Sequence, residues 1–337
     1  MKIKKPKTSI LFPFYNAELT LERAISSISD QTFTDFECIL INNNSSDNSA
    51  EIANRFCEAD KRFLLVHEEK RGIVYALNHG LKVARGEFIA RMDADDWSFP
   101  DRLEHQNKFL NEHKEYGVVA GKAEYKSHKP ETGGFERYVN WSNSILDFKD
   151  IYNKQFMESP LIHPTVMWRK SVSDKYGVYA YGNFPEDYEL WLRWLANGVK
   201  FHKLRESVIK WFDTDQRLTR THVRYSDEAF YSIKTHYLVK WLKIHNPWHP
   251  KVLVWGASKI SRNRALLLEN PGIKISGFID ISKKRQLDRS IIYYKDIPTP
   301  KETFILIYLK EESMRANTVN FLTERGFKEG KNYLLVS

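Results

Sequence analysis

The chain has 337 residues, of which 42% are hydrophobic and 14% aromatic, so it can bury sizeable cores. Its net charge of +9 favours anionic partners, namely sugar nucleotides, an acidic lipid surface or nucleic acid, although basic residues are spread along the whole chain. No motif of a nucleic-acid-binding fold accompanies them, so we expect no nucleic-acid partner. No apolar run reaches the roughly 20 residues of a membrane span, the N-terminus lacks the features of a signal peptide, and the two cysteines have no metal or redox spacing. We therefore expect a cytoplasmic protein.

Apolar runs alternate with helical patterns through the first hundred residues. Strands are expected at 9–12, 36–41, 63–66 and 88–92, and helices at about 21–28, 50–59 and 73–84. This βαβαβαβ order predicts an α/β fold with a mostly parallel central sheet and right-handed crossovers. Polar residues repeatedly fall where a strand ends, which is the edge at which open α/β sheets bind ligands.

The most informative of these polar groups is acidic. Asp93, Asp95 and Asp96 directly follow the apolar run 88–92, and three carboxylates at this density repel one another unless a cation lies among them. Hard oxygen ligands suit Mg²⁺ or Mn²⁺, which bind one or two carboxylates together with substrate phosphates. The alternative is a solvated acidic turn that caps a helix starting near Pro100. The position after a buried strand favours the metal.

Four motifs in this order resemble the family 2 glycosyltransferases, which have the GT-A fold. They are Pro13-Phe14-Tyr15-Asn16, the turn 42–47, Arg71-Gly72-Ile73 with Ala76, Asn78 and Gly80, and the stretch 85–96 followed by Pro100-Asp101-Arg102-Leu103. The resemblance implies a nucleoside diphosphate sugar as donor, most simply a UDP-sugar, and a divalent metal, Mn²⁺ or Mg²⁺, on Asp93 and Asp95.

The same resemblance implies a donor-binding set drawn from all four motifs. Its members are Pro13, Tyr15, Asn16, Asn42, Asn43, Asn44, Asp47, Arg71, Gly72, Asn78, Arg91, Asp93, Ala94 and Asp95. Family members often carry an acidic residue where this chain has Asn42 and Asn43. An Asn amide can accept a hydrogen bond from a pyrimidine N–H and donate to its carbonyl, so we expect base binding to survive with an altered preference.

Motifs of the second half would supply the chemistry and the acceptor contacts. Pro185 precedes Glu186 and Asp187 at a predicted helix start, where carboxylates are also favoured simply because they cap the helix dipole. The resemblance implies that Asp187 takes the acceptor proton, supported by Glu186. Acceptor or sugar contacts are expected from His163, Trp191, Asp96 and Trp97, with a satisfied structural histidine as the alternative for His163 and burial in the core as the alternative for Trp191.

Two further stretches are less specific. The stretch 122–150 is expected to be a polar, loop-rich, acceptor-facing region. The loop that follows the strand 208–212 contains Arg217, Arg220 and His222, which are candidates for closing over the diphosphate. This loop lacks the His that related enzymes often have at its start, so a solvated surface loop remains the alternative.

A second α/β unit begins near Lys251. Residues 225–250 are expected to form a connecting helix and linker, either packed on the first domain (1–224) or lying on a membrane surface with its aromatic residues down. The strand, turn and helix from 251 resemble a Rossmann-like fold, with Asp280 where a ribose-binding acid would stand. Ser258 and Ser261 occupy glycine positions of that pattern, which argues against dinucleotide binding in the domain 251–337.

These observations predict a metal-dependent inverting glycosyltransferase acting on a hydroxyl of a glycan or lipid-linked acceptor. Bacterial surface polysaccharide synthesis, with peripheral contact to the inner face of the membrane, is the expected setting. The alternatives are a non-catalytic sugar-nucleotide-binding or assembly module, and a nucleotidyltransferase. The latter usually has a glycine-rich basic loop after its first strand, where this chain has Pro13-Phe14-Tyr15-Asn16. The sequence indicates no oligomeric state.

Overall fold

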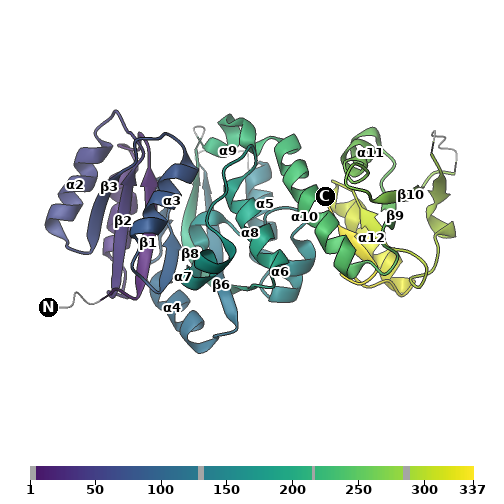
Figure 1. Cartoon of the computed structure of the whole chain (residues 1–337), viewed down its shortest axis with the longest axis horizontal. Coiled ribbons are helices and arrows are strands. Elements are labelled where there is room, and N and C mark those ends of the chain that lie inside the picture. The colour runs from purple at the N-terminus through teal and green to yellow at the C-terminus, as the bar shows by residue number, and fades with distance from the viewer. Residues whose placement is uncertain (1–4, 128–132, 215–216, 284–288) are drawn as a thin grey trace. The chain divides into compact units, whose positions relative to one another are not determined.

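The computed structural model describes residues 5–127, 133–214, 217–283 and 289–337 (Figure 1). Its internal contacts divide the chain into two compact units. Unit 1 comprises Met1–Ile151 and Pro160–His222, and unit 2 comprises Tyr152–Ser159 and Val223–Ser337. The helix expected as a connector is therefore grouped with the C-terminal sheet, and so is the short segment Tyr152–Ser159.

Unit 1 is built on an eight-stranded mixed sheet with the order β3-β2-β1-β4-β7-β6-β8-β5. The strands are β1 (Thr8–Phe14), β2 (Phe36–Asn42), β3 (Phe63–His67), β4 (Phe88–Arg91), β5 (Trp97–Ser98), β6 (Tyr116–Ser127), β7 (Met167–Arg169) and β8 (Lys200–Asp213). The first four are parallel, as predicted, whereas β7 is antiparallel to β4 and β6. Together these strands form the α/β, GT-A-like fold that the sequence predicts.

Helices connect and cover these strands. They are α1 (Leu21–Ser29), α2 (Ser49–Ala59), α3 (Ile73–Val83), α4 (Arg102–Glu112), α5 (Gly134–Ser144), α6 (Phe148–Lys154), α7 (Lys170–Tyr176), α8 (Glu186–Ala196) and α9 (Leu218–Thr221). Every residue of β1 and β2 is buried, which explains their mostly apolar character, and the buried Glu37 of β2 is paired with Arg85. On α3, a Cβ at Gly80 would lie 2.7 Å from Ile41 Cδ1, so the glycine permits close contact between helix and sheet.

The described part of the stretch 122–150, from which residues 128–132 are excluded, is not the loop region predicted from its polarity. β6 continues to Ser127 and pairs with β8 over most of its length, and the helices α5 and α6 follow. Pairing with β8 satisfies the backbone groups of this polar segment, and burial of Ala123 anchors it to the core. Tertiary pairing thus overrides the weak local strand signal.

Unit 2 contains a parallel five-stranded sheet with the order β11-β10-β9-β12-β13. Its strands are β9 (Lys251–Trp255), β10 (Lys274–Asp280), β11 (Ile291–Tyr293), β12 (Ile305–Ile307) and β13 (Tyr333–Leu335), and its helices are α10 (Asp227–His245), α11 (Lys259–Leu266) and α12 (Glu312–Glu324). Strand β9 lies at the centre, as the first strand of a Rossmann-like fold does.

The aromatic residues of α10 lie inside unit 2. Trp241 is 6% exposed, and its ring centroid lies 5.8 Å from that of Phe304. Tyr237 is also buried, and the buried Lys234 Nζ donates to the carbonyls of Met157 and Val336. The alternative in which these aromatics contact a membrane is therefore wrong, because packing within unit 2 already buries them. Among the described residues, no helix has the length and apolarity needed to cross a bilayer.

Candidate active site

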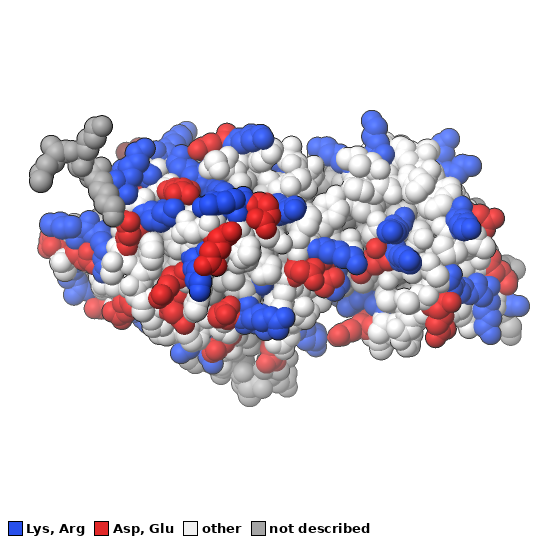
Figure 2. All heavy atoms as spheres, turned by 90° about the horizontal axis from the view of Figure 1, so that it is seen from below, with Lys and Arg blue, Asp and Glu red and all other residues white. Residues whose placement is uncertain are grey.

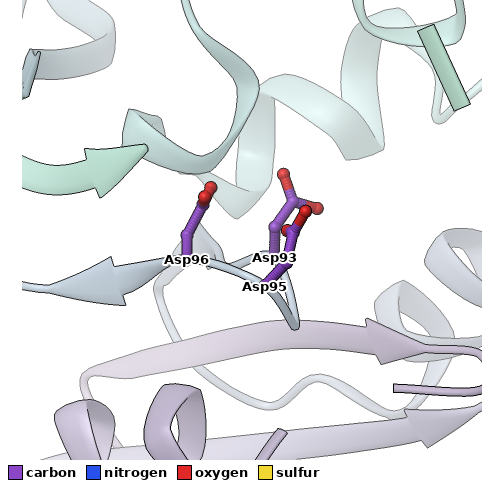
Figure 3. A group of neighbouring side chains, drawn as sticks. All are labelled: Asp93, Asp95 and Asp96. Carbon is purple, nitrogen blue, oxygen red and sulfur yellow. The ribbon is translucent and has the colours of Figure 1, made fainter. Parts of the chain in front are cut away.

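The three aspartates lie on the short connection between β4 and β5, with their side chains on the same side of the chain (Figure 3). One carboxylate oxygen from each can be chosen so that all three lie within 4.8 Å of one another. One oxygen of Asp96, Oδ2, is buried without a hydrogen-bond partner among the described residues. The donor set and this orphaned oxygen fit a hard divalent cation such as Mg²⁺ or Mn²⁺.

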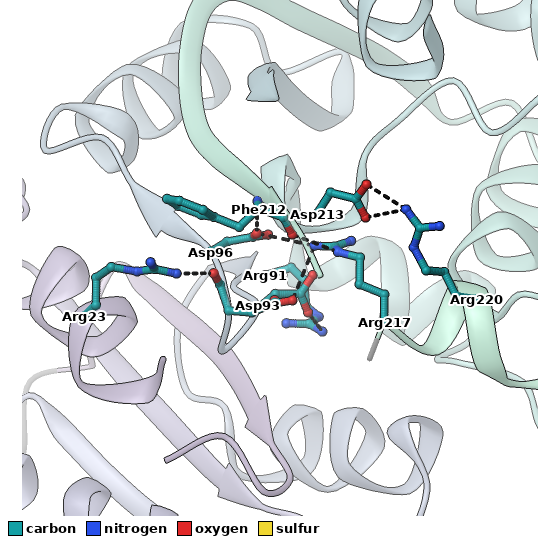
Figure 4. A network of polar contacts seen from close by, with 9 residues as sticks. Arg23, Arg91, Asp93, Asp96, Phe212, Asp213, Arg217 and Arg220 are labelled. Atoms are coloured by element: carbon teal, nitrogen blue, oxygen red, sulfur yellow. Dashed lines mark hydrogen bonds and ion pairs between the residues drawn. The ribbon is translucent and has the colours of Figure 1, made fainter. Parts of the chain in front are cut away.

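Two arginines partly compensate the acidic cluster (Figure 4). Buried Arg91 forms an ion pair with Asp93, and Arg217 Nη2 lies 3.6 Å from Asp95 Oδ2 and 3.4 Å from Asp96 Oδ1. Burial alone would raise the pKa of Asp93, but Arg91 and Arg217 outweigh it and hold that pKa below its ordinary value. Burial raises the pKa of Asp95, and that of Asp96 more strongly. The two arginines thus do not fully offset the burial of Asp95 and Asp96, and a bound cation would favour the ionised form of both carboxyl groups.

A second buried arginine, Arg102, holds the backbone next to the acidic cluster. Arg102 Nη2 donates to the carbonyl of Arg91 over 2.7 Å, and its Nε donates to Gln106 Oε1. Burial, followed by the charge of Arg91, lowers the pKa of Arg102 to about 9. The sequence placed Arg102 within a motif but assigned it no role. Its function is to hold the end of β4, from which Asp93 projects.

The turns after β1 and β2 hold several of the residues that the sequence predicts to bind the donor. Asn16 Oδ1 accepts from the backbone N–H of Ser46, which joins the two turns, and both Asn16 and exposed Asn44 have positive φ. Asp47 accepts from the backbone N–H groups of Ser49 and Glu18, so its carboxylate stabilises the start of α2 and the approach to α1. Pro13 lies within β1 beside β2.

The amides of Asn42 and Asn43 are engaged with the protein itself. Asn43 Oδ1 accepts from the Gly72 N–H over 2.7 Å, and its Nδ2 donates to the Lys70 carbonyl over 2.7 Å. Asn42 Oδ1 accepts from the Ser45 N–H, and its Nδ2 lies 3.3 Å from His67 Nδ1. Both amides thus hold the neighbouring loops in place. Their predicted contact with a base stays a prediction.

An exposed aromatic and cationic pair stands beside these amides. The Arg71 guanidinium lies 4.3 Å from the ring centroid of Tyr15, which is 42% exposed. Gly72 has a φ of 134°, a conformation that favours glycine at the start of α3. One turn further along α3, Asn78 Nδ2 donates to the Tyr179 carbonyl. Helix α3 therefore links the donor motifs to a segment of the second half of the chain.

His163 lies in a buried polar contact near the acidic cluster. Its Nε2 is 2.7 Å from the Tyr179 hydroxyl, and burial, followed by the charge of Arg91, lowers its pKa to about 3. Burial raises the pKa of Tyr179 well above its ordinary value. The charge of Arg91 lowers this pKa, whereas the charges of Asp187 and Asp93 raise it. No motif in the sequence singles out Tyr179. The imidazole of His163 is thus neutral, although the charges of Arg91 and Asp93 act on it.

Asp187 is the second residue of α8, after Glu186, and its Oδ1 accepts from the Tyr188 N–H. Burial, together with the charge of Glu186 and a smaller effect of Asp93, raises the pKa of Asp187 to about 8. A carboxyl group with a pKa near neutrality is suited to accept a proton. The structure thereby brings Asp187 into the same electrostatic environment as Asp93.

Among the predicted acceptor contacts, Trp191 differs from the expectation, whereas those of Asp96 and Trp97 stay predictions. Trp191 is fully buried among Trp168, Trp194 and Phe201, so it belongs to the core and offers no ring face to a sugar. Asp96 Oδ1 accepts from the Phe212 N–H on β8. Trp97 stacks edge-on against Phe99, with the Lys210 ammonium 4.3 Å from its ring centroid.

The three loop candidates also differ from one another. Arg217 contacts the acidic cluster, whereas Arg220 Nη2 forms a bidentate pair with Asp213 at 2.8 and 2.7 Å (Figure 4). His222 is exposed. Only Arg217 therefore stands among the groups that could meet a diphosphate. Arg23, which the sequence did not single out, donates to the Asp95 carbonyl.

A sheet whose first four strands are parallel, an acidic cluster at the end of β4 and an acidic helix start at α8 are features of the GT-A-like fold of nucleotide-diphospho-sugar transferases. The model of glycosyl transferase family 2 matches residues 9–177. EpsE of Bacillus subtilis (strain 168), a glycosyltransferase by name, is 31% identical over 66% of this chain and 78% of its own length. The O-antigen biosynthesis glycosyltransferase WbnJ of Escherichia coli is 28% identical over 67% of this chain and 87% of its own length.

Solved structures share the fold. TarS residues 1–349 of S. aureus, in complex with UDP-GlcNAc, superposes with a TM-score of 0.56 at 18% identity, covering 78% of this chain and 71% of that one. The mannosyltransferase PcManGT of Pyrobaculum calidifontis, in complex with GDP-Man and Mn²⁺, gives 0.51 at 18% identity over 71% and 64%. The chain belongs to glycosyltransferase family 2 and is a glycosyltransferase.

Proposed function

We propose that the protein is a metal-dependent inverting glycosyltransferase that moves a sugar from a nucleoside diphosphate to a hydroxyl of a glycan or lipid-linked acceptor. The observation that carries this proposal is the acidic cluster at the end of β4, where one carboxylate oxygen each of Asp93, Asp95 and Asp96 lie within 4.8 Å of one another in a chain of this family. Such a cluster is suited to a diphosphate-bound cation.

The donor is proposed to lie along the carboxyl edge of β2, β1 and β4. Tyr15 and Arg71 offer an exposed aromatic ring and a guanidinium on which a base can stack, and the turn joined by Asn16 borders the ribose position. A UDP-sugar is the donor we favour, because TarS, which shares the fold, was solved with UDP-GlcNAc. The GDP-Man complex of PcManGT makes a GDP-sugar the comparison to include.

Asp93 and Asp95 would hold the divalent cation, with Asp96 beside them. The cation would supply Lewis-acid stabilisation of the negative charge that develops on the leaving diphosphate. Arg217 contributes a guanidinium at the same place, and Arg91 orients the Asp93 carboxylate. Asp187, with Glu186 as its charged neighbour, would take the proton of the attacking hydroxyl, and attack opposite the leaving group inverts the anomeric carbon.

The setting is proposed from the named relatives. WbnJ is named for O-antigen biosynthesis, and AmsE of Erwinia amylovora for amylovoran biosynthesis. We propose a role in bacterial surface polysaccharide synthesis at the inner face of the membrane, where lipid-linked acceptors are presented.

The test measures sugar transfer and donor hydrolysis with a panel of UDP- and GDP-sugars and Mn²⁺. We expect Asp187→Asn and Asp95→Asn to lower turnover by at least roughly 100-fold, which is the low end of general base catalysis. Asp101→Asn, on the exposed side chain at the start of α4, is the matched control and keeps activity. Tight donor binding without turnover in the parent protein would identify a binding module instead. Release of pyrophosphate from a nucleoside triphosphate would identify a nucleotidyltransferase.

A further inference from the structure

The excess positive charge of this protein lies entirely in its C-terminal part. Residues 1–222 contain 32 Lys and Arg and 32 Asp and Glu, whereas residues 223–337 contain 20 and 11. On the face drawn in Figure 2, basic and acidic side chains are interspersed over unit 1. Although basic residues occur along the whole chain, the net charge of +9 thus belongs to unit 2.

Unit 2 also exposes apolar side chains at one edge of its sheet. Ile260 is 64% exposed, Ile281 68% and Met314 48%. Ile281 directly follows β10, Ile260 lies in the first turn of α11 after β9, and Met314 lies in the first turn of α12 after β12. Because β10, β9 and β12 are neighbouring parallel strands, all three side chains lie at the same carboxyl edge.

Each of these apolar side chains is accompanied by an exposed lysine. Lys283 follows β10, Lys259 starts α11, and Lys310 follows β12. We call these six residues the apolar–basic edge. Among the described residues, the acidic residues beside it are Glu311 and Glu312 at its β12 end and Asp280, the buried last residue of β10. The apolar–basic edge therefore combines isolated apolar side chains with cationic ones. Their spacing is set by the neighbouring strands, which lie about 5 Å apart.

The same edge is poorly suited to a dinucleotide. Ser261 Oγ donates to the Tyr308 carbonyl, Ser258 Oγ donates to Ser261 Oγ, and Ser258 caps α11 by accepting from the Ser261 N–H. These hydroxyls fill the turn after β9, where a pyrophosphate would need close approach to the backbone. The position that binds nucleotides in related folds is thus closed by an internal network.

We propose that the apolar–basic edge docks unit 2 on an anionic lipid bilayer. Lysines would contact lipid phosphates, and Ile260, Ile281 and Met314 would enter the interfacial layer, as on other peripheral proteins that combine charge with apolar side chains. The net charge of unit 2 supplies the longer-range attraction. Charge complementarity favours this occupant, and the exposed apolar side chains favour lipid over a nucleic acid. The proposal does not depend on the catalytic assignment.

The experiment is flotation of the full-length protein with vesicles of phosphatidylcholine alone or with phosphatidylglycerol, at low and high salt. The parent protein should bind only the anionic vesicles, and more weakly at high salt. Lys259→Gln/Lys283→Gln/Lys310→Gln should lower the partition coefficient on the order of 100-fold, since each lysine near such a surface contributes about 1 kcal/mol. Ile260→Ser/Ile281→Ser/Met314→Ser should lower it at least roughly tenfold at unchanged charge.

The matched control is Lys251→Gln/Lys274→Gln/Lys331→Gln, which removes the same charge from the opposite ends of strands in the same sheet. It should retain most of the binding. Equal losses in the two lysine variants would overturn the proposal, because net charge alone would then explain binding. Absence of binding to anionic vesicles, or a serine variant that binds like the parent, would overturn it as well. Tighter binding to a single-stranded oligonucleotide than to vesicles would identify a polyanion site instead.

Discussion

The carboxylate of Asp93 helps to raise the pKa of Asp187, although the two residues come from different halves of unit 1. Asp93 follows β4, and Asp187 opens α8. The antiparallel strand β7, inserted between β4 and β6, returns the chain to the end of β4 and so allows the two halves to share one site.

The pH dependence of transfer should follow the ionisation of Asp187. A base must be deprotonated, so kcat/KM is expected to rise with pH and then level off. Burial and Glu186 raise the pKa to about 8, and a bound cation acts in the opposite direction, so the rise should lie between the ordinary value of 3.8 and about 8. Glu186→Gln removes the second cause and should move the rise to lower pH. An unchanged profile in this variant would contradict the assignment.

Asp187→Asn should yield an inactive protein that is more stable than the parent at alkaline pH. The pKa of Asp187 is higher in the folded state than in the unfolded state, so between these values the folded state binds more protons. Stability is therefore lost as pH rises through that window. Asparagine has no such cost and can still accept from the Tyr188 N–H.

Urea denaturation of metal-free protein at pH 5 and pH 9 measures this effect. The stability advantage of Asp187→Asn over the parent should be larger at pH 9, by at least about 1 kcal/mol. An equal difference at both pH values would mean that Asp187 is not buried as a neutral acid in the free protein.

Arg217→Gln should change how the acidic cluster binds cations. Without its guanidinium, Asp95 and Asp96 lose a competing positive charge, so Mn²⁺ should bind the nucleotide-free protein more tightly, by roughly tenfold or about 1.4 kcal/mol. UDP should bind more weakly, because a cation facing the diphosphate is gone. Titration calorimetry measures both affinities. Arg220→Gln removes the same charge from the Asp213 pair and should leave Mn²⁺ affinity near the parent value.

Asn43→Asp changes the shape of the side chain only slightly, but it should destabilise the protein. The Asn43 amide donates to the carbonyls of Lys70 and Glu68, and a carboxylate would face those two oxygens without a proton to share. We expect a loss of about 1–3 kcal/mol in the free energy of unfolding. Asn44→Asp is the control, since Asn44 is exposed in the same turn and Asp also tolerates its positive φ. Equal losses in both variants would argue against this account.

Apolar patterns within short segments of the sequence predict some of the strands and helices without reference to the rest of the chain. The buried strands β1, β2 and β4 read as apolar runs because both faces of a parallel sheet are covered, and the stripe of α1 has helical spacing. The stretch 122–150 was misjudged because β6 is stabilised by pairing with β8, whose residues lie far away in the sequence. Trp191 was ambiguous for the same reason, since its burial depends on Trp168 and Phe201.

Sequence by itself determined the family, the two α/β units and the aspartates of the acidic cluster, because strand periodicity and closely spaced carboxylates are properties of short segments. Tertiary structure alone decided that Arg217 contacts Asp95, that Asn43 holds the loop before Gly72, and that Tyr179 meets His163. It also decided which sheet edge carries the exposed isoleucines. These relationships depend on distances between segments remote in the chain, and burial and charge act through space rather than along the sequence.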